Sequence, residues 1–256
     1  MVKIKMNKAQ NLQINLQNTL KAKSKIILLL ALSLLTVNAN SAPITLSGSN
    51  FDIIYDSALT GLFGTPILSG NAIFFTPISF KAESLNGNGV VTANSTINLS
   101  IIEHNDKNIT SLNLLERGDY RLVGNDSVVG IGGQTRAFDL SNPFIESTDA
   151  ISSASNLTIK NTIVDSSTHN WTSSSFISLV DAKWANTKSF NYTIENLLTA
   201  YTEPTATGPK VAFIEKKFAG SSISLIVSTV PEANTNALLL TGLGAIGFIA
   251  RRRKLG

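Results

Sequence analysis

Residues 190–195 read Phe-Asn-Tyr-Thr-Ile-Glu and alternate strictly between apolar and polar side chains. A period of two places every second side chain on one face of a β-strand, so this stretch predicts a strand with one buried face. The same alternation recurs in residues 51–56, 97–101, 156–160 and 222–227. No long window has the period of an amphipathic helix, and we expect at most one helical turn, within residues 195–201. The region from Pro43 to Thr229 is therefore predicted to be all-β.

Short polar and glycine-containing segments separate the predicted strands. Residues 86–89 (Asn-Gly-Asn-Gly) are the strongest hairpin signal, because asparagine and glycine tolerate positive φ. Residues 116–119 (Glu-Arg-Gly-Asp) and 124–126 predict further tight turns, and residues 130–133 form a glycine-rich break. About 10–12 strands with regular turn spacing favour two packed antiparallel sheets, that is, an antiparallel β-sandwich or jelly-roll-like domain.

The last 27 residues differ in character from the β region. They contain Val230-Pro231-Glu232, a short polar spacer, an uncharged run from Ala237 to Ala250, and the basic cluster Arg251, Arg252, Arg253 and Lys254. As a helix the run would be about 21 Å long, short for a hydrocarbon core of roughly 30 Å. The stems of the basic residues and local thinning of the bilayer compensate for such a mismatch. We predict a membrane helix at 237–250, although its length alone would favour a buried core helix.

These three elements, in this order, resemble the PEP-CTERM sorting signal of Gram-negative bacteria. The resemblance covers residues 230–254 and implies recognition by an exosortase, a membrane protease-transpeptidase that removes the tail during export to the cell surface. The family motif usually reads Pro-Glu-Pro, and Ala233 replaces its second proline here. Residues 51–66, 78–87 and 116–120 are also similar to an uncharacterised group of PEP-CTERM cargo proteins. Such a signal is an address and does not specify the activity of the domain before it.

The N-terminus predicts a secretory signal peptide over residues 1–41. Six lysines precede a mostly apolar run at residues 26–37, and small residues follow it, so we expect cleavage near Ala39 or Ser41. An uncleaved anchor is the alternative. The expected partners at this stage are the secretion translocon and signal peptidase. The basic cluster at the C-terminus would stay on the cytoplasmic side of the inner membrane, which leaves residues 42–229 exported.

The charge of the whole chain is misleading. The formal net charge is +4, but six of the 21 basic residues lie in the N-terminal segment and four in the tail. The middle of the chain therefore has 11 basic and 16 acidic residues, a net charge of −5. This balance removes the basic footprint that nucleic-acid binding requires, so no nucleic-acid partner is expected. The absence of cysteine also excludes disulfides and thiolate metal sites.

Few residues suggest catalysis or metal binding. The two histidines, His104 and His169, are expected at the surface, and no nucleophile elbow, Walker loop or Rossmann fingerprint is present. Glu116 and Asp119 are paired carboxylates, but solvated charges are ordinary in a turn. Asp119, Asn125, Asp126 and Asp139 offer oxygen ligands for Ca²⁺ without the spacing of a calcium loop, so we expect no cofactor. Trp171 and Trp184 are predicted to pack in the core, with a sugar-stacking platform as the alternative.

We therefore expect an exported, non-enzymatic protein, anchored in the inner membrane as an intermediate and then delivered to the cell surface or extracellular matrix. Its expected role is structural, adhesive or matrix-forming, with exopolysaccharide as the candidate ligand. Two alternatives stay open. A glycan-active enzyme would require two carboxylates in a cleft, whereas a carbohydrate-binding module would require coplanar exposed aromatic rings on one sheet face.

Overall fold

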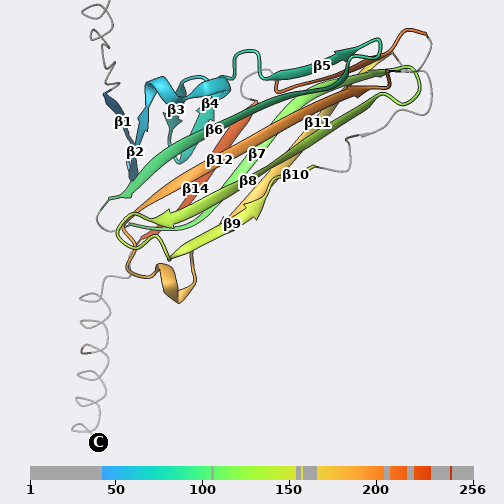
Figure 1. Ribbon diagram of the computed structural model, residues 1–256. Coiled ribbons are helices and arrows are strands. Elements are labelled where there is room, and N and C mark those ends of the chain that lie inside the picture. Colours follow the sequence, from blue (N-terminus) through green and yellow to red (C-terminus); the bar gives the residue numbers. More distant parts are fainter. Residues whose placement is uncertain are drawn as a thin grey trace, which may run out of the picture. The chain divides into compact units, whose positions relative to one another are not determined.

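The computed structural model describes residues 42–104, 107–153, 157, 166–204, 208–217, 222–231 and 243 (Figure 1). The chain divides into two units, residues 1–41 and 42–256. The predicted signal peptide, the basic cluster 251–254 and all of the predicted membrane helix except Leu243 lie outside the described residues. Among the residues that are described, no helix has the length and apolar character required to cross a membrane.

The second unit contains two antiparallel sheets (Figure 1). The first sheet has six strands in the order β1-β2-β6-β12-β8-β9. Their bounds are β1 (Pro43–Ser47), β2 (Phe51–Asp56), β6 (Gly89–Glu103), β12 (Ser189–Thr202), β8 (Val128–Asp139) and β9 (Glu146–Ala150). β12 is the central strand, and it pairs along nearly its whole length with β6 on one side and β8 on the other.

The second sheet has eight strands and is organised around β7 (Lys107–Val123). The other strands are β10 (Ser152–Ser153), β11 (Thr168–Ser178), β14 (Ile223–Pro231), β4 (Ala72–Phe75), β3 (Pro66–Ser69), β13 (Val211–Glu215) and β5 (Lys81–Leu85). One edge of β7 pairs with β11, and its other edge pairs with β14 and then with β13. Three short 3-10 helices complete the fold: η1 (Ser57–Leu59), η2 (Gly61–Phe63) and η3 (Ala182–Trp184).

The core lies between the two sheets and follows the alternation in the sequence. In β12 the buried side chains include Phe190, Tyr192 and Ile194, while their neighbours face outward. Four of the five alternating runs are strands, namely β2, β6, β12 and β14. The fifth run, residues 156–160, lies outside the described residues except for Leu157, which is not in a strand. The predicted all-β fold with antiparallel sheets is confirmed.

The predicted turn at residues 116–119 is wrong, because all four residues lie within β7. Gly118 is required there for close packing and not for a turn. A Cβ atom at Gly118 would lie 1.9 Å from the carbonyl oxygen of Glu215 and 2.7 Å from the indole of Trp171. The helical turn expected at residues 195–201 is also wrong, since these residues continue β12. The glycine-rich residues 130–133 likewise lie inside a strand, β8.

The turn at residues 86–89 is present, but it does not close a hairpin. β5 ends at Leu85 and pairs with β13 of the second sheet, whereas β6 begins at Gly89 and pairs with strands of the first sheet. The turn therefore carries the chain from one sheet to the other. Asn86 adopts a positive φ of 47°, and its side-chain oxygen accepts a hydrogen bond from the backbone N–H of Lys210.

Candidate functional site at the tail end of the sandwich

β14 ends inside the segment that the sequence identifies as a sorting signal. Val230 pairs with Asn108 and Pro231 with Lys107, so both are backbone partners of the first residues of β7. The pairing register shifts between Ser228 and Thr229, which marks a bulge just before the signal begins. Val230 is 46% exposed. The other predicted signal residues (Glu232, Arg251, Arg252, Arg253 and Lys254) and the cleavage candidates Ala39 and Ser41 lie outside the described residues.

Two loops flank this end of β14, and Asp139 joins them. The β8–β9 loop follows Asp139, whose Oδ1 accepts hydrogen bonds from the backbone N–H groups of Ser141 at 2.6 Å and Asn142 at 2.9 Å. Its Oδ2 accepts a bond from the hydroxyl of Thr187 at 2.5 Å, in the connection between β11 and β12. The bond from Thr187 and those from the two backbone N–H groups lower the pKa of Asp139, against the opposing effect of burial.

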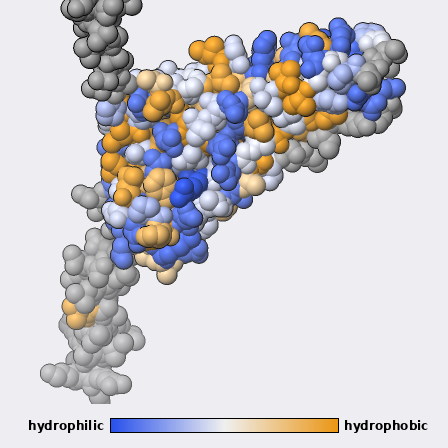
Figure 2. Space-filling model, viewed as in Figure 1, coloured by the Kyte–Doolittle hydropathy of each residue, from blue (hydrophilic) through white to orange (hydrophobic). Residues whose placement is uncertain are grey.

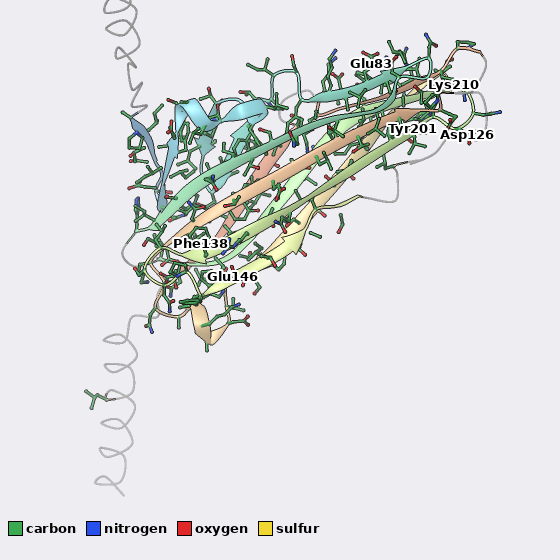
Figure 3. The ribbon with its side chains drawn as sticks, in the orientation of Figure 1. Glu83, Asp126, Phe138, Glu146, Tyr201 and Lys210 are labelled. Carbon is green, nitrogen blue, oxygen red and sulfur yellow. The ribbon has the colours of Figure 1, made fainter. Side chains whose placement is uncertain are left out.

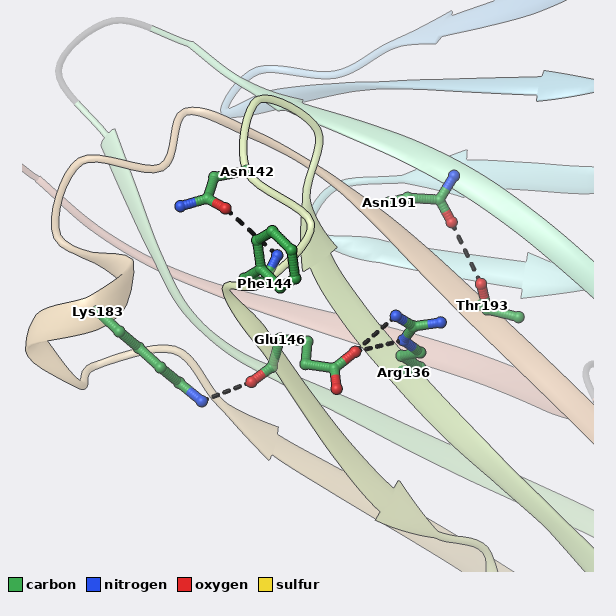
Figure 4. Close-up of polar contacts among 7 residues, drawn as sticks. All are labelled: Arg136, Asn142, Phe144, Glu146, Lys183, Asn191 and Thr193. Atoms are coloured by element: carbon green, nitrogen blue, oxygen red, sulfur yellow. Dashed lines mark hydrogen bonds and ion pairs between the residues drawn. The ribbon is translucent and has the colours of Figure 1, made fainter.

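The connection between β11 and β12, residues 179–188, is attached to both the loop and β7. Its η3 segment is held by Trp184, whose indole N–H donates to the hydroxyl of Ser147 at 3.2 Å. Lys183 Nζ donates to the carbonyl oxygen of Glu146 at 2.5 Å (Figure 4). Lys188 Nζ donates to Asn108 Oδ1 at 2.8 Å, and Asn108 is the residue opposite Val230. The β8–β9 loop, the 179–188 connection and the end of β14 therefore form one surface, named the tail end here.

The tail end presents large apolar side chains to solvent. Phe144 is 96% exposed, Val180 is 69% exposed and Leu140 is 44% exposed. The backbone N–H of Phe144 donates to Asn142 Oδ1 at 3.3 Å, which helps to fix the tip of the β8–β9 loop (Figure 4). Sequence reasoning did not single out these residues, because an isolated apolar residue in a loop has no pattern that separates it from a core residue.

The outer surface of the first sheet is a second candidate site. We name it the polar face: Asn94, Thr96, Asn98, Gln134, Arg136, Thr193 and Glu195. These residues form rows across β6, β12 and β8, for example Asn98 beside Thr193 beside Arg136. The hydroxyl of Thr193 donates to Asn98 Oδ1 at 2.7 Å, and Gln134 Nε2 donates to Glu195 at 3.1 Å. Figure 2 shows polar and apolar patches interleaved on this side of the molecule.

Arg136 is the most constrained side chain of the polar face. Its guanidinium lies 2.5 Å from Glu146 Oε2 (Figure 4). The guanidinium also stands over the ring of Phe138, 5.0 Å from the ring centroid. Both charged partners are about half exposed, so solvent and salt weaken their attraction. The pair therefore orients the guanidinium more than it stabilises the fold.

The two predicted carboxylates do not form a pair, because Glu116 is buried whereas Asp119 is partly exposed. Glu116 is completely buried between the sheets, where its carboxylate meets Lys216 Nζ at 2.5 Å and accepts bonds from Ser173 and from the amide of Asn196. Desolvation lowers the pKa of Lys216, and the adjacent carboxylate opposes this shift. Desolvation and the nearby Glu215 raise the pKa of Asp119. Glu116 is thus an internal structural ion pair and has no access to a substrate.

The aromatic and calcium candidates are likewise separated from one another. Trp171 and Trp184 are 0% and 4% exposed, which confirms core packing for both. Asn125 and Asp126 lie in the turn before β8, whereas Asp139 ends that strand. Figure 3 shows Asp126 at the opposite end of the sandwich from Phe138. No group of three or more His, Asp or Glu residues with metal-binding geometry occurs within the described ranges. His104 is part-exposed and contacts Asp52 at 3.0 Å.

Comparison with known families identifies the tail. Residues 229–254 match the family described as the PEP-CTERM protein-sorting motif. The β14 terminus is therefore the start of a recognised sorting signal, and the chain carries a PEP-CTERM sorting motif. A comparison with curated proteins finds no match.

Three solved structures share partial likeness with the chain. A structure of infectious bursal disease virus, Gx strain, has a TM-score of 0.30 at 13% identity and covers 60% of this chain and 30% of the viral chain. The adhesin domain of Epf from Streptococcus pyogenes has a TM-score of 0.21 at 10% identity and covers 76% of this chain and 62% of that domain. A cellulose-binding domain from Cellulomonas fimi β-1,4-glucanase C has a TM-score of 0.18 at 9% identity, with coverages of 67% and 99%. Scores this low support no inference about fold or function.

Proposed function

We infer that the protein is exported and that an exosortase processes it from a membrane-anchored intermediate toward the cell surface, as the sorting motif implies. We propose that the β-sandwich then serves as a non-catalytic component of the cell surface or extracellular matrix, and that its polar face contacts exopolysaccharide. The observation that carries the proposal is the joining of this motif to a sandwich whose outer sheet surface displays rows of hydroxyl and amide groups.

The polar face suits a polysaccharide for a geometric reason. Neighbouring strands lie about 4.8 Å apart and side chains on one face repeat every two residues, so donors and acceptors form a regular lattice. Asn98, Thr193 and Gln134 each supply neutral hydrogen-bonding groups of the kind that sugar hydroxyls pair with. The net charge of −5 in the middle of the chain favours neutral or cation-bridged glycans over strongly acidic ones.

Two observations favour this role over the alternatives. The carboxylate of Glu116 is sealed inside the core, which weakens the hypothesis of a glycan-active enzyme. Both tryptophans are buried, which weakens the hypothesis of a carbohydrate-binding module with an aromatic platform. A matrix component that binds many weak sites along a polymer needs neither a catalytic cleft nor an aromatic platform. Its overall avidity comes from many linked contacts, each of which raises the effective concentration of the next.

The test is retention of the mature chain on immobilised exopolysaccharide from the producing organism. Replacing Asn98 and Thr193 together by alanine is expected to weaken retention at least about fivefold, since each lost hydrogen bond is worth about 1 kcal/mol. The matched control replaces Asn113 and Ser174, exposed residues on the outer face of the second sheet, and is expected to leave retention unchanged. A folded wild-type chain that is not retained would refute the proposal.

A further inference from the structure

The chain between β14 and the apolar run is so short that it holds the tail end near the membrane whenever the tail is anchored. Only residues 232–236 separate the end of β14 from the apolar run that begins at Ala237. However these residues are arranged, six Cα–Cα steps span at most roughly 20 Å. The headgroup layer on each side of a hydrocarbon core is itself about 5–8 Å thick. While the tail is anchored, Pro231 is therefore held within a short distance of the lipid headgroups.

The exposed apolar residues belong to that same end. Leu179, which precedes Val180, donates its backbone N–H to the carbonyl oxygen of Thr110 at 2.9 Å, and the hydroxyl of Thr110 donates to the carbonyl oxygen of Ser228. Leu140 donates its backbone N–H to Ser189, the residue after Lys188. Hydrogen bonds therefore connect the loop that contains Val180 to β7 and β14, and the loop that contains Leu140 to the first residue of β12.

The loops are also built to hold these side chains outward. Asp139 fixes the β8–β9 loop through its bonds to Ser141, Asn142 and Thr187. Trp184 is buried and attaches η3 to Ser147, and Val180, four residues before it, is 69% exposed. Lys183 lies in the same connection, together with Asp181, while Lys188 is paired with Glu103 at 3.3 Å. The surface is therefore nearly balanced in charge, and its exposed apolar side chains are the groups that would contact a lipid interface.

We propose that the tail end is a lipid-contacting surface, with Phe144, Val180 and Leu140 entering the headgroup region of a phospholipid bilayer while the tail anchors the chain. This inference rests on the proposed export and anchoring of the tail. The contact itself is weak, but the tether supplies a high effective concentration, so weak insertion suffices to orient the sandwich. Its consequence is that the β14 terminus is presented at the membrane surface, where a membrane-embedded exosortase would meet it.

The absence of cysteine permits a direct test by single-cysteine labelling. The chain, with its tail retained, is purified from cells that lack exosortase and reconstituted into vesicles of phosphatidylethanolamine and phosphatidylglycerol. Fluorophores at Ser141→Cys, Asn125→Cys and Leu243→Cys report the tail end, the opposite end of the sandwich and the tail, respectively. Quenching by lipids that carry a nitroxide near the headgroup then measures the contact of each label with the bilayer.

We expect strong quenching at positions 141 and 243 and none at position 125. In the Ser141→Cys chain, the further pair Phe144→Ser and Val180→Ser is expected to lower quenching by about half or more, because the apolar contacts that hold the tip in the interface are removed. The matched control pair is Leu59→Ser and Ile78→Ser, which alters two residues that are 65% and 74% exposed and lie outside the tail end, in η1 and between β4 and β5. That pair is expected to leave quenching unchanged.

Each contrary outcome identifies what fails. Quenching at 243 together with equal, weak signals at 141 and 125 would overturn the lipid-contact inference and leave the anchored tail intact. No quenching at any position would show that the tail does not insert, and both proposals would fail. If exosortase is added to the vesicles and the fluorescence at position 141 changes only then, the tail end contacts a protein partner instead of lipid.

Discussion

Glu116 Oε2 lies 2.5 Å from Lys216 Nζ, and neither side chain has any exposure to solvent. The pair joins β7 to the residue that follows β13, and Asn196 of the first sheet donates to the other carboxylate oxygen. The ammonium of Lys216 also lies 5.2 Å from the ring of Phe80 and 5.4 Å from that of Trp171. One buried carboxylate therefore connects both sheets of the sandwich and is matched by a single buried cation.

Removal of one partner should be more damaging than removal of both. Lys216→Met leaves the Glu116 carboxylate buried without a counter-charge and is expected to lower the free energy of unfolding by about 3–5 kcal/mol. The double variant Glu116→Leu with Lys216→Met removes both charges and is expected to recover part of that loss. Urea titration of the purified domain measures both values. Equal stability of the single and double variants would show that the unpaired charge is not the source of the damage.

Gly118 should tolerate no side chain. Gly118→Ala places a Cβ atom 1.9 Å from the carbonyl oxygen of Glu215, a backbone atom that cannot move without breaking the β7–β13 pairing. We expect a loss of about 1–3 kcal/mol or more in the free energy of unfolding. Gly130→Ala is the matched control. Gly130 also lies in a strand, but a Cβ atom added there would be 3.8 Å from its nearest neighbour. A similar loss for the two variants would indicate a general cost of altering strand glycines.

Tyr192 should make the domain sensitive to alkaline pH. Burial is the largest cause that raises the pKa of Tyr192 far above its ordinary value of 10.0. The folded state therefore keeps its proton while an unfolded tyrosine ionises, so the contribution to stability is complete below pH 10 and falls as the pH rises further. The slope is about 1.4 kcal/mol per pH unit. Tyr192→Phe is expected to remove this slope, measured as the difference between the two unfolding free energies from pH 8 to about 11. A constant difference would contradict the prediction.

The sequence predicts the strands well where the determinant is local and poorly where it is distant. Residues 190–195 form a strand because alternation in six residues is enough to define a buried face. Residues 116–119 look like a turn because two charges and a glycine suggest exposure, but the charge of Glu116 is neutralised by Lys216, 100 residues later in the sequence. At residues 86–89 the local turn was predicted correctly, while its partners were not, since turn chemistry does not determine which sheet receives the next strand.

The candidate sites show the same division. The sorting signal is recognisable because Val230, Pro231 and the elements after them form a contiguous pattern. The tail end is not recognisable, because Phe144 and Val180 are 36 residues apart, and only the contacts of Asp139, Trp184 and Thr110 connect their loops to one end of the sandwich. Neither residue has a sequence neighbour that distinguishes it from a core residue.

Asp139 should stabilise the tail end in a manner that acid removes. Its pKa is lowered from an ordinary value of 3.8, chiefly by the hydroxyl of Thr187, so its contribution is present above that value and is lost as the pH falls through the folded pKa. Asp139→Asn is expected to lower the free energy of unfolding by about 1–3 kcal/mol at neutral pH. The loss should shrink below pH 4, because the wild-type carboxyl is then being protonated. Chemical unfolding at several pH values measures this, and a pH-independent loss would contradict it.

Processing of the tail should require the end of β14 to leave β7. Proteases generally bind substrates in an extended form whose backbone groups are free, whereas Val230 and Pro231 are paired with Asn108 and Lys107. Directly opposed residues of antiparallel strands have Cα atoms about 4.5–5.5 Å apart, within the range of a disulfide. Asn108→Cys with Val230→Cys should therefore form a disulfide that keeps the start of the signal paired with β7, in a chain with no other cysteine.

We expect the oxidised double variant to accumulate as the unprocessed, membrane-bound form in cells that contain exosortase, and reduction to restore cleavage. Electrophoresis of membrane and surface fractions measures the ratio of the two forms. The matched control is Leu115→Cys with Ser224→Cys, an opposed pair near the start of β14 that leaves the end of β14 able to separate from β7. The bulge at Ser228 and Thr229 interrupts the pairing between these two disulfide positions. Only the disulfide between residues 108 and 230 should therefore prevent processing. Cleavage at the wild-type rate with that disulfide intact would show that the exosortase acts on the signal beyond Pro231 without opening the strand.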